Sequence, residues 1–108
     1  MMNCQELATA ARYEAYPIVL VVNNSMLGTI RMHQEREFTK RVMGTGLTNP
    51  DFVMFAQSFG MPGYRVSKTE EFAAAFEKAL ASNKGALIEL VLDPEVITPT
   101  KLLSKLAK

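Results

Sequence analysis

The sequence predicts an α/β fold, with a short parallel sheet between two layers of helices. Segments of helical periodicity alternate with short apolar runs, an order typical of parallel strands joined by right-handed crossovers. The first apolar run, residues 18–22, has no polar alternation, as in a strand covered on both faces. Apolar residues make up 48% of the 108 positions, which is ordinary for a globular chain.

A helix over residues 5–13 comes first and the strand at 18–22 second. Asn3 and Glu6 have the spacing of a capping box at the start of this helix, and Pro17 stops it. The strand then contains only Ile, Val and Leu. These residue types favour a pleated, buried backbone.

A second helix starts near residues 26–28 and runs to about Glu37. Gly28 weakens its start, because glycine loses more backbone freedom in a helix than other residues. Periodicity fails over residues 38–48, where glycines and threonines mix with basic residues. That segment is predicted to be a loop.

The next elements are a helix that begins at Asn49 and a strand at 63–66. Asn49 is predicted to be the N-cap, with Pro50 at the first helical position and Gly60 after the end. The apolar stripe of this helix consists of Phe52, Val53, Phe55, Ala56 and Phe59.

Ser67 and Glu70 form a second predicted capping box, and the helix after it runs to about Ser82. Its apolar face consists of Phe72, Phe76 and Leu80. Residues 83–85, Asn-Lys-Gly, then form a turn, and residues 86–92 form the third strand. Glu89 conflicts with that apolar run, and it lies at a strand edge or pairs with a lysine.

A short last helix is predicted to start at Thr98 and Pro99. The leucines of this segment would face inward and its lysines outward: Leu102, Leu103 and Leu106, and Lys101, Lys105 and Lys108. There are no internal repeats and no linker, so residues 1–108 are predicted to form one domain.

Composition excludes several classes of function. Twelve basic and eleven acidic residues give a net charge of +1, which favours no nucleic-acid partner. No apolar run approaches the ~20 residues of a membrane span, and the N-terminus lacks the pattern of a signal peptide. The single cysteine, Cys4, suits a reducing compartment, so a cytoplasmic location is predicted.

Two asparagines interrupt the chain where the first strand ends, in the stretch "VLVVNNSMLGTI". Ligands bind beyond the carboxyl ends of parallel strands, and Asn23 and Asn24 lie at such an end. An amide oxygen and a freed carbonyl suit Mg²⁺, and a helix N-terminus nearby favours phosphate. The alternative is a plain asparagine-rich turn, because Asn also caps helices and tolerates left-handed geometry.

Four blocks together resemble the C-terminal, diphosphate-binding domain of thiamine-diphosphate enzymes. They are "QELATA", "PIVLVVNNSMLGTIR", "LTNPDFVMFAQSFG" and "ALIELVLDPEVITP", in that order. The resemblance covers nearly the whole chain and is strongest to carboligases and decarboxylases of the acetolactate-synthase type. It implies a partial thiamine-diphosphate-binding fold with strand order 1-3-2.

The resemblance also implies a cofactor site in residues 23–28. Asn24 would give its side-chain oxygen and Met26 its backbone carbonyl to Mg²⁺, while Asn23 supports the turn. Leu27 and Gly28 complete the segment that binds thiamine diphosphate. The family motif begins with Gly-Asp-Gly, and this sequence starts after the position where that part would stand.

The implied function is that of a C-terminal part of a thiamine-diphosphate- and Mg²⁺-dependent enzyme acting on 2-keto acids. The chain is then expected to lack any catalytic residue, to bind the cofactor weakly or not at all, and to be inactive alone. The strand at 18–22 would form an edge of the sheet, so self-association as a homo-oligomer is also expected. The alternative is a non-catalytic binding or assembly module.

Thr29 and Ile30 follow the motif at positions where relatives line a substrate pocket, although Ile30 fits a helix core equally well. His33 has no Cys or His cluster around it and is interpreted as structural or exposed. Cys4 is interpreted as a small buried residue rather than a nucleophile.

Overall fold

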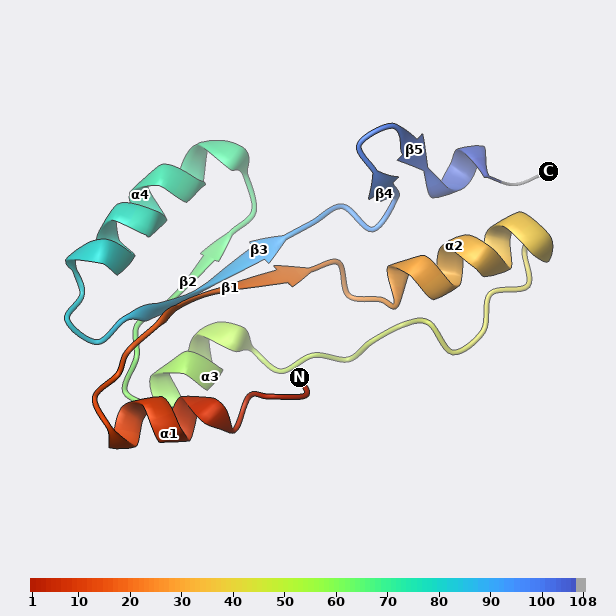
Figure 1. The fold of residues 1–108 in the computed structure, drawn as a ribbon. Coiled ribbons are helices and arrows are strands. Elements are labelled where there is room, and N and C mark those ends of the chain that lie inside the picture. Colours follow the sequence, from red (N-terminus) through yellow and green to blue (C-terminus); the bar gives the residue numbers. More distant parts are fainter. Residues whose placement is uncertain (107–108) are drawn as a thin grey trace. The chain divides into compact units, whose positions relative to one another are not determined.

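The computed structural model describes residues 1–106, so Lys108 lies outside the described residues. Contacts divide the chain into two compact units, one formed by residues 1–22 and 50–91, the other by 23–49 and the segment from 92 onward. The main elements are labelled in Figure 1. In chain order they are α1 (Glu6–Arg12), β1 (Ile18–Asn23), α2 (Gly28–Glu37), α3 (Phe52–Ser58), β2 (Gly63–Val66), α4 (Thr69–Ala81), β3 (Ala86–Val91), β4 (Val96–Thr98), β5 (Lys101–Leu102) and the 3₁₀ turn Leu103–Lys105.

The central sheet has the strand order β1-β3-β2, and its strands run parallel (Figure 1). This confirms the predicted order and the predicted parallel sheet. Arg65 of β2 stands opposite Glu89 of β3, and Gly63 opposite Leu87. Of the three strands, β3 is the most buried, with its first four residues buried.

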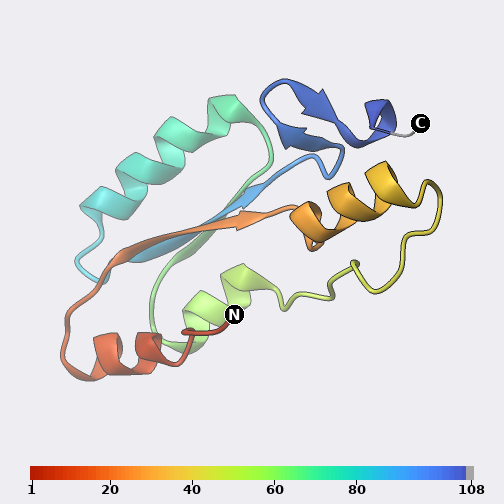
Figure 2. The same cartoon turned by 45° about the vertical axis from the view of Figure 1, so that its right-hand side comes forward.

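Helices cover both faces of the sheet, which confirms the predicted three-layer arrangement. α1 and α3 lie on one face and α4 on the other (Figures 1 and 2). The first face encloses a buried cluster of Leu7, Phe52, Ala56, Met61 and Leu87. The second encloses Val66, Ala79, Ala86 and Ile88.

β1 is less covered than its composition predicts. Val19 and Val21 pack under α1 and α3, and Ile18 packs under α4. Leu20 and Val22 share the face of Ile18 but remain 46% and 63% exposed. The expected burial on both faces is therefore wrong for this end of the strand.

The N-cap of α3 is Asp51 and not Asn49. The Asp51 carboxylate accepts hydrogen bonds from the backbone N–H groups of Val53 and Met54, at 2.9 and 3.0 Å. Asp and Asn cap helices equally well, so composition could not separate the two positions. Asn49 is thereby left for another role.

The two predicted capping boxes are not formed as expected. The side chain of Gln5, at the cap position of α1, makes no capping hydrogen bond. At α4 the carboxylate that accepts the Ser67 N–H belongs to Glu71, at 3.1 Å, and not to Glu70. Both helices nevertheless lie close to their predicted bounds.

The second unit contains α2, the loop after it and a small C-terminal hairpin. β4 and β5 pair antiparallel where a helix was predicted from Thr98 and Pro99. Thr98 ends β4, Pro99 lies in the turn, and Leu103 of the 3₁₀ turn is buried at 3% exposure. The β-branched residues of β4 favour a strand, and the turn chemistry of proline outweighs the helical spacing of the leucines. Within residues 1–106 no helix is long and apolar enough to span a membrane.

Candidate functional site

The candidate site is the turn of residues 23–28, which joins β1 to α2. β1 ends at Asn23, Asn24 follows it directly, and α2 begins at Gly28. Ser25 has a left-handed backbone with φ of 57°, unusual for a residue other than glycine. The pair of asparagines therefore lies at the carboxyl end of a parallel strand, where the sequence predicted it.

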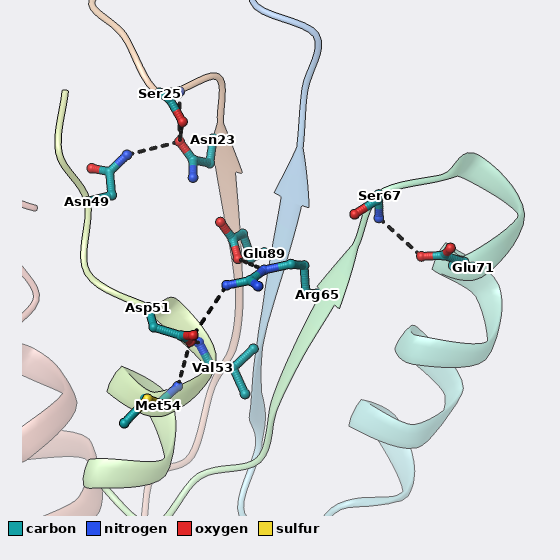
Figure 3. A network of polar contacts seen from close by, with 10 residues as sticks. All are labelled: Asn23, Ser25, Asn49, Asp51, Val53, Met54, Arg65, Ser67, Glu71 and Glu89. Carbon is teal, nitrogen blue, oxygen red and sulfur yellow. Dashed lines mark hydrogen bonds and ion pairs between the residues drawn. The ribbon is translucent and has the colours of Figure 1, made fainter. Parts of the chain in front are cut away.

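The Asn23 side chain organises this turn (Figure 3). Its Oδ1 accepts a hydrogen bond from the Ser25 N–H at 2.8 Å and lies 3.4 Å from the Ser25 hydroxyl. The same oxygen accepts from Nδ2 of Asn49 at 3.0 Å. The backbone carbonyl of Asn23 accepts a hydrogen bond from the N–H of Leu92 at 2.8 Å. Asn23 is thus held on both its side chain and its backbone.

The Asn24 side chain lies over the start of α2. Its Oδ1 accepts a hydrogen bond from the backbone N–H of Met26 at 3.3 Å. A Cβ on residue 28 would lie 2.9 Å from Asn24 Nδ2, so glycine at this position leaves room for the amide. Met26 is buried at 7% exposure. The need for room beside the Asn24 amide therefore explains why glycine, a weak helix former, stands at the start of α2.

Residues 43–49, named the clasp segment here, run alongside the turn. The Leu27 N–H donates to the carbonyl of Thr45 at 2.8 Å, and the Leu47 N–H donates to that of Ser25 at 2.9 Å. Met26 and Gly46 form an antiparallel bridge between these bonds. The clasp segment therefore holds the turn through backbone pairing as well as through Asn49.

The other end of the clasp segment is tied to α2 by Gln34. Its Nε2 donates to the carbonyl of Met43 at 2.9 Å, and its Oε1 accepts from the N–H of Met43 at 3.2 Å. A hollow of about 550 Å³ opens beside this contact, lined by Gln34, Phe38, Arg41, Val42 and Met43. Side chain and backbone thus fix a loop that has no regular structure of its own.

The donor set at the turn is neutral. No group of three or more His, Cys, Asp or Glu side chains that could hold a metal occurs among residues 1–106. The oxygens that suit a hard cation here are the Asn24 amide oxygen and the backbone carbonyls of the turn. These oxygens suit part of the coordination shell of Mg²⁺. Because the ion is doubly charged, carboxylate or phosphate oxygens are needed as further ligands.

Arg31 contacts the turn at Met26. Its Nη1 lies 3.6 Å from the Met26 sulfur, and its Nη2 lies 3.8 Å from a carboxylate oxygen of Glu35. Its Nε is buried without a hydrogen-bond partner. The guanidinium packs on Met26 and so supports a residue within the turn.

A second polar cluster lies in the sheet unit and joins three elements (Figure 3). Arg65 Nε donates to Oε2 of Glu89 at 2.7 Å, and its Nη2 lies 3.5 Å from Asp51 Oδ2. Glu89 is only 4% exposed in the central strand, so the predicted edge position is wrong, and this ion pair is made with an arginine where a lysine was predicted as the alternative. The cluster neutralises a buried carboxylate and ties the start of α3 to the sheet.

Two ionisable groups of this cluster have shifted pKa values. The backbone N–H of Met54 lowers the pKa of Asp51 most, desolvation opposes this shift, and the charge of Arg65 and the N–H of Val53 lower it further. The hydrogen bond to Glu89 raises the pKa of Arg65 most, followed by the charges of Glu89 and Asp51. Both shifts favour the charged forms that hold the cluster together.

The remaining candidates lie outside these networks. Thr29 and Ile30 are exposed on the first turn of α2, Ile30 at 50%, so Ile30 is not a core residue. His33 is exposed, as interpreted, with Nδ1 2.8 Å from Nη2 of Arg36. Cys4 is a free thiol and is half-buried rather than buried.

Residues 1–90 match the protein family described as "Thiamine pyrophosphate enzyme, C-terminal TPP binding domain". The chain belongs to this family. Thiamine pyrophosphate is thiamine diphosphate under its older name, so the predicted resemblance is confirmed. The match includes the sheet unit except its last residue, together with the 23–28 turn and the clasp segment, and it ends before the β4–β5 hairpin.

Individual relatives in the thiamine pyrophosphate enzyme family are also similar. The chain is 35% identical over 94 residues to "Acetolactate synthase isozyme 2 large subunit" of Escherichia coli, covering 86% of this chain. It is 35% identical over 106 residues, or 94% of the chain, to "Putative thiamine pyrophosphate-containing protein YdaP" of Bacillus subtilis. A "Probable acetolactate synthase large subunit" of Methanocaldococcus jannaschii is 31% identical over 100 residues, 92% of the chain. In each case the chain spans 17% of the relative's own length.

Sequence reasoning missed the residues that hold the asparagine turn in place. Asn49 was predicted to cap a helix, and Thr45 and Leu47 were placed in a loop without a role. Asn49 contacts Asn23 across 26 positions of sequence, and no local pattern marks such a pairing. Thr45 and Leu47 of the clasp segment bond to the turn through backbone atoms, which any residue type could supply.

Proposed function

We propose that this chain supplies the turn that binds metal and diphosphate in a thiamine-diphosphate-dependent enzyme of the acetolactate-synthase type. The observation that carries the proposal is the asparagine turn at the carboxyl end of β1, with Asn24 lying over Gly28 at the start of a helix. The family match over residues 1–90 supports the identity of the cofactor. The relatives' names support the class of enzyme.

In this proposal Asn24 Oδ1 and the Met26 carbonyl are ligands of Mg²⁺, and Asn23 fixes the backbone between them. Leu27 and Gly28 lie at the N-terminal end of α2 and would border the diphosphate, because the helix dipole and the N–H groups of its first turn favour anions there. The Leu27 N–H itself is bonded to the Thr45 carbonyl. Thr29 and Ile30 come next along the helix and border the 2-keto-acid substrate. The thiamine ring, when bound, serves as the electron sink for breaking or forming a carbon–carbon bond.

The full site needs more than residues 1–108. They contain no Gly-Asp-Gly sequence, and the described part contains no group of three or more His, Cys, Asp or Glu side chains that could hold a metal. We therefore propose that this chain by itself binds Mg²⁺ and thiamine diphosphate with affinity in the millimolar range and has no turnover. Keto-acid chemistry then belongs to an assembly in which other protein segments supply the charged metal ligand and the groups that activate the ring.

The proposed partners and location follow from the chain's surface and composition. We propose one domain over residues 1–108 that acts in the cytoplasm on a small molecule, without nucleic acid or membrane. The open edge of β1, with Leu20 and Val22 exposed beside it, favours a second copy of the chain as its partner.

A nuclear magnetic resonance titration tests the cofactor proposal. Mg²⁺ and thiamine diphosphate are added together at millimolar concentrations to the labelled chain. We expect the backbone amides of residues 26–28 and the side-chain amide of Asn24 to shift and saturate, and the Asn24→Ala variant to lose this response. Shifts that are absent, or that fall outside residues 23–30, would contradict the proposal and favour a non-catalytic assembly module.

A further inference from the structure

We propose that Asn49 is a positioning residue for the metal- and diphosphate-binding turn and that it acts through Asn23. The inference rests on the function proposed above, because it concerns the geometry of Asn24 and Met26 as ligands. Asn49 touches neither of these two residues in any hydrogen bond found within residues 1–106. Its effect would therefore be transmitted by the side chain that shapes the turn.

Asn49 contacts Asn23 Oδ1 from a distant part of the sequence. Ser25, which lies within the turn itself, approaches the same oxygen with its N–H and its hydroxyl. Nδ2 of Asn49 donates to it from the end of the clasp segment at 3.0 Å. The donors of Ser25 can follow the turn wherever it moves, whereas Asn49 ties the turn to another segment of the chain.

The backbone of the turn needs such an anchor. Ser25 has a left-handed conformation, which is unfavourable for a residue with a Cβ and persists only where neighbouring bonds impose it. The bonds from Leu27 to Thr45 and from Leu47 to Ser25 hold its backbone from the same segment. Asn49 adds the side-chain bond at the strand end of this ladder, while Gln34 holds the segment at Met43.

The position of this turn decides where both proposed ligands point. Asn24 and Met26 flank Ser25, so a rotation of the Ser25 backbone moves the amide oxygen and the carbonyl apart or together. Mg²⁺ demands near-octahedral geometry and tolerates little displacement of its ligands. Loss of a supporting group behind a metal ligand typically weakens affinity by about tenfold or more.

The experiment compares Asn49→Ala with Asn83→Ala in the full chain. Asn83 is exposed in the turn after α4 and serves as the matched control. The first readout is the apparent Kd for Mg²⁺ with thiamine diphosphate, from the amide shifts of residues 26–28. The second is the rate of amide hydrogen exchange at Ser25 in the absence of both, with the amide of Ile88 in the buried sheet as a reference for folding.

We expect Asn49→Ala to weaken the apparent Kd by about tenfold and to speed exchange at Ser25, with Ile88 unchanged. Asn83→Ala should change neither quantity. In a double-mutant cycle, Asn49→Ala should have no further effect on the Kd once Asn23→Ala is present. This non-additivity separates positioning through Asn23 from a general loss of structure.

The outcomes distinguish failure of this inference from failure of the proposed function. If the wild-type chain gives no saturating shift at residues 26–28, the proposed function fails. If the wild-type chain binds and Asn49→Ala binds equally well, or if its effect adds fully to that of Asn23→Ala, the positioning role of Asn49 is overturned while the proposed function stands.

Discussion

At the asparagine turn, two residues of the same type have different roles because they occupy different positions. Asn23 and Asn24 are neighbours, yet one side chain shapes the backbone and the other lies over the helix start. The sequence predicted the location of the pair, because buried strands rarely end in two amides without a reason. It could not predict Asn49 as a partner, because that contact is made only when the chain folds.

The Gly28→Ala variant should affect cofactor binding more than it affects the stability of the fold. Alanine favours a helix over glycine by about 1 kcal/mol, but the new Cβ would displace the Asn24 amide. That amide is the end of a flexible side chain, so it can move at small cost. We expect the free energy of unfolding to stay within about 1 kcal/mol of wild type, while the affinity for Mg²⁺ with thiamine diphosphate falls by about tenfold.

Chemical unfolding and the nuclear magnetic resonance titration measure these two quantities. Thr69→Ala is a suitable control, since Thr69 is exposed in the first turn of another helix, α4. Unchanged affinity in Gly28→Ala would show that the room above residue 28 has no bearing on the proposed site.

At the scale of elements, most of the fold could be predicted from periodicity and turn residues. The strand β2 has its predicted bounds, and α2 and β3 lie within a residue or two of theirs. The β4–β5 hairpin was missed because Thr98 and Pro99 resemble a helix start, and the pairing that forms the hairpin is not visible in local spacing. The partner of the buried Glu89 could not be predicted without the strand register, which places Arg65 opposite it.

The start of β3 depends on a glycine that no other residue can replace without strain. Gly85 has φ of 61°, and a Cβ there would collide with the backbone carbonyl of Pro17. Gly60 also has a positive φ, of 75°, but a Cβ would meet nothing nearby. We expect Gly85→Ala to lower the free energy of unfolding by about 3 kcal/mol or more, and Gly60→Ala by only about 1 kcal/mol. Equal losses in urea unfolding would refute the close approach of Gly85 to Pro17.

The cap of α3 should make stability depend on pH in acid. The folded pKa of Asp51 is lowered, chiefly by the Met54 N–H, so the charged carboxylate stabilises the fold above its unfolded pKa of about 4. This contribution is lost as the pH falls through the lower, folded pKa. Asp51→Asn keeps a capping side chain without the charge.

We therefore expect wild type to melt at a higher temperature than Asp51→Asn near neutral pH. The difference should shrink as the pH falls through the folded pKa, when both side chains are neutral. A difference between the two melting temperatures that stays constant from neutral to strongly acidic pH would contradict this account of the cap.

At the scale of the whole molecule, the edge strand β1 exposes apolar side chains and one row of backbone groups. Within the described chain β1 pairs on one side only, with β3, and Leu20 and Val22 stay exposed on its face. An apolar strand edge of this kind tends to recruit another chain. Its position at the edge followed from family resemblance, whereas the exposure of these two side chains became evident only from the packing of α4.

Self-association through this edge is the corresponding prediction. Val22→Lys places a charge on the exposed face and should shift the chain toward monomer, because burial of an unpaired lysine is costly. Leu80→Lys, on α4, alters a side chain of similar exposure and should leave association unchanged. Light scattering over a range of protein concentration measures both. A wild-type chain that stays monomeric at high concentration would refute the proposed partner.

We propose above that the 23–28 turn holds the metal of a thiamine-diphosphate site, and a paramagnetic ion tests this directly. Mn²⁺ has the same preference for oxygen ligands as Mg²⁺ and broadens the magnetic resonance signals of nearby nuclei. With Mn²⁺ and thiamine diphosphate present, the side-chain amide of Asn24 and the backbone signals of Met26 should broaden first, and excess Mg²⁺ should restore them. Broadening centred on the carboxylates of Asp93 and Glu95, with the signals of Asn24 and Met26 unaffected, would contradict the claim.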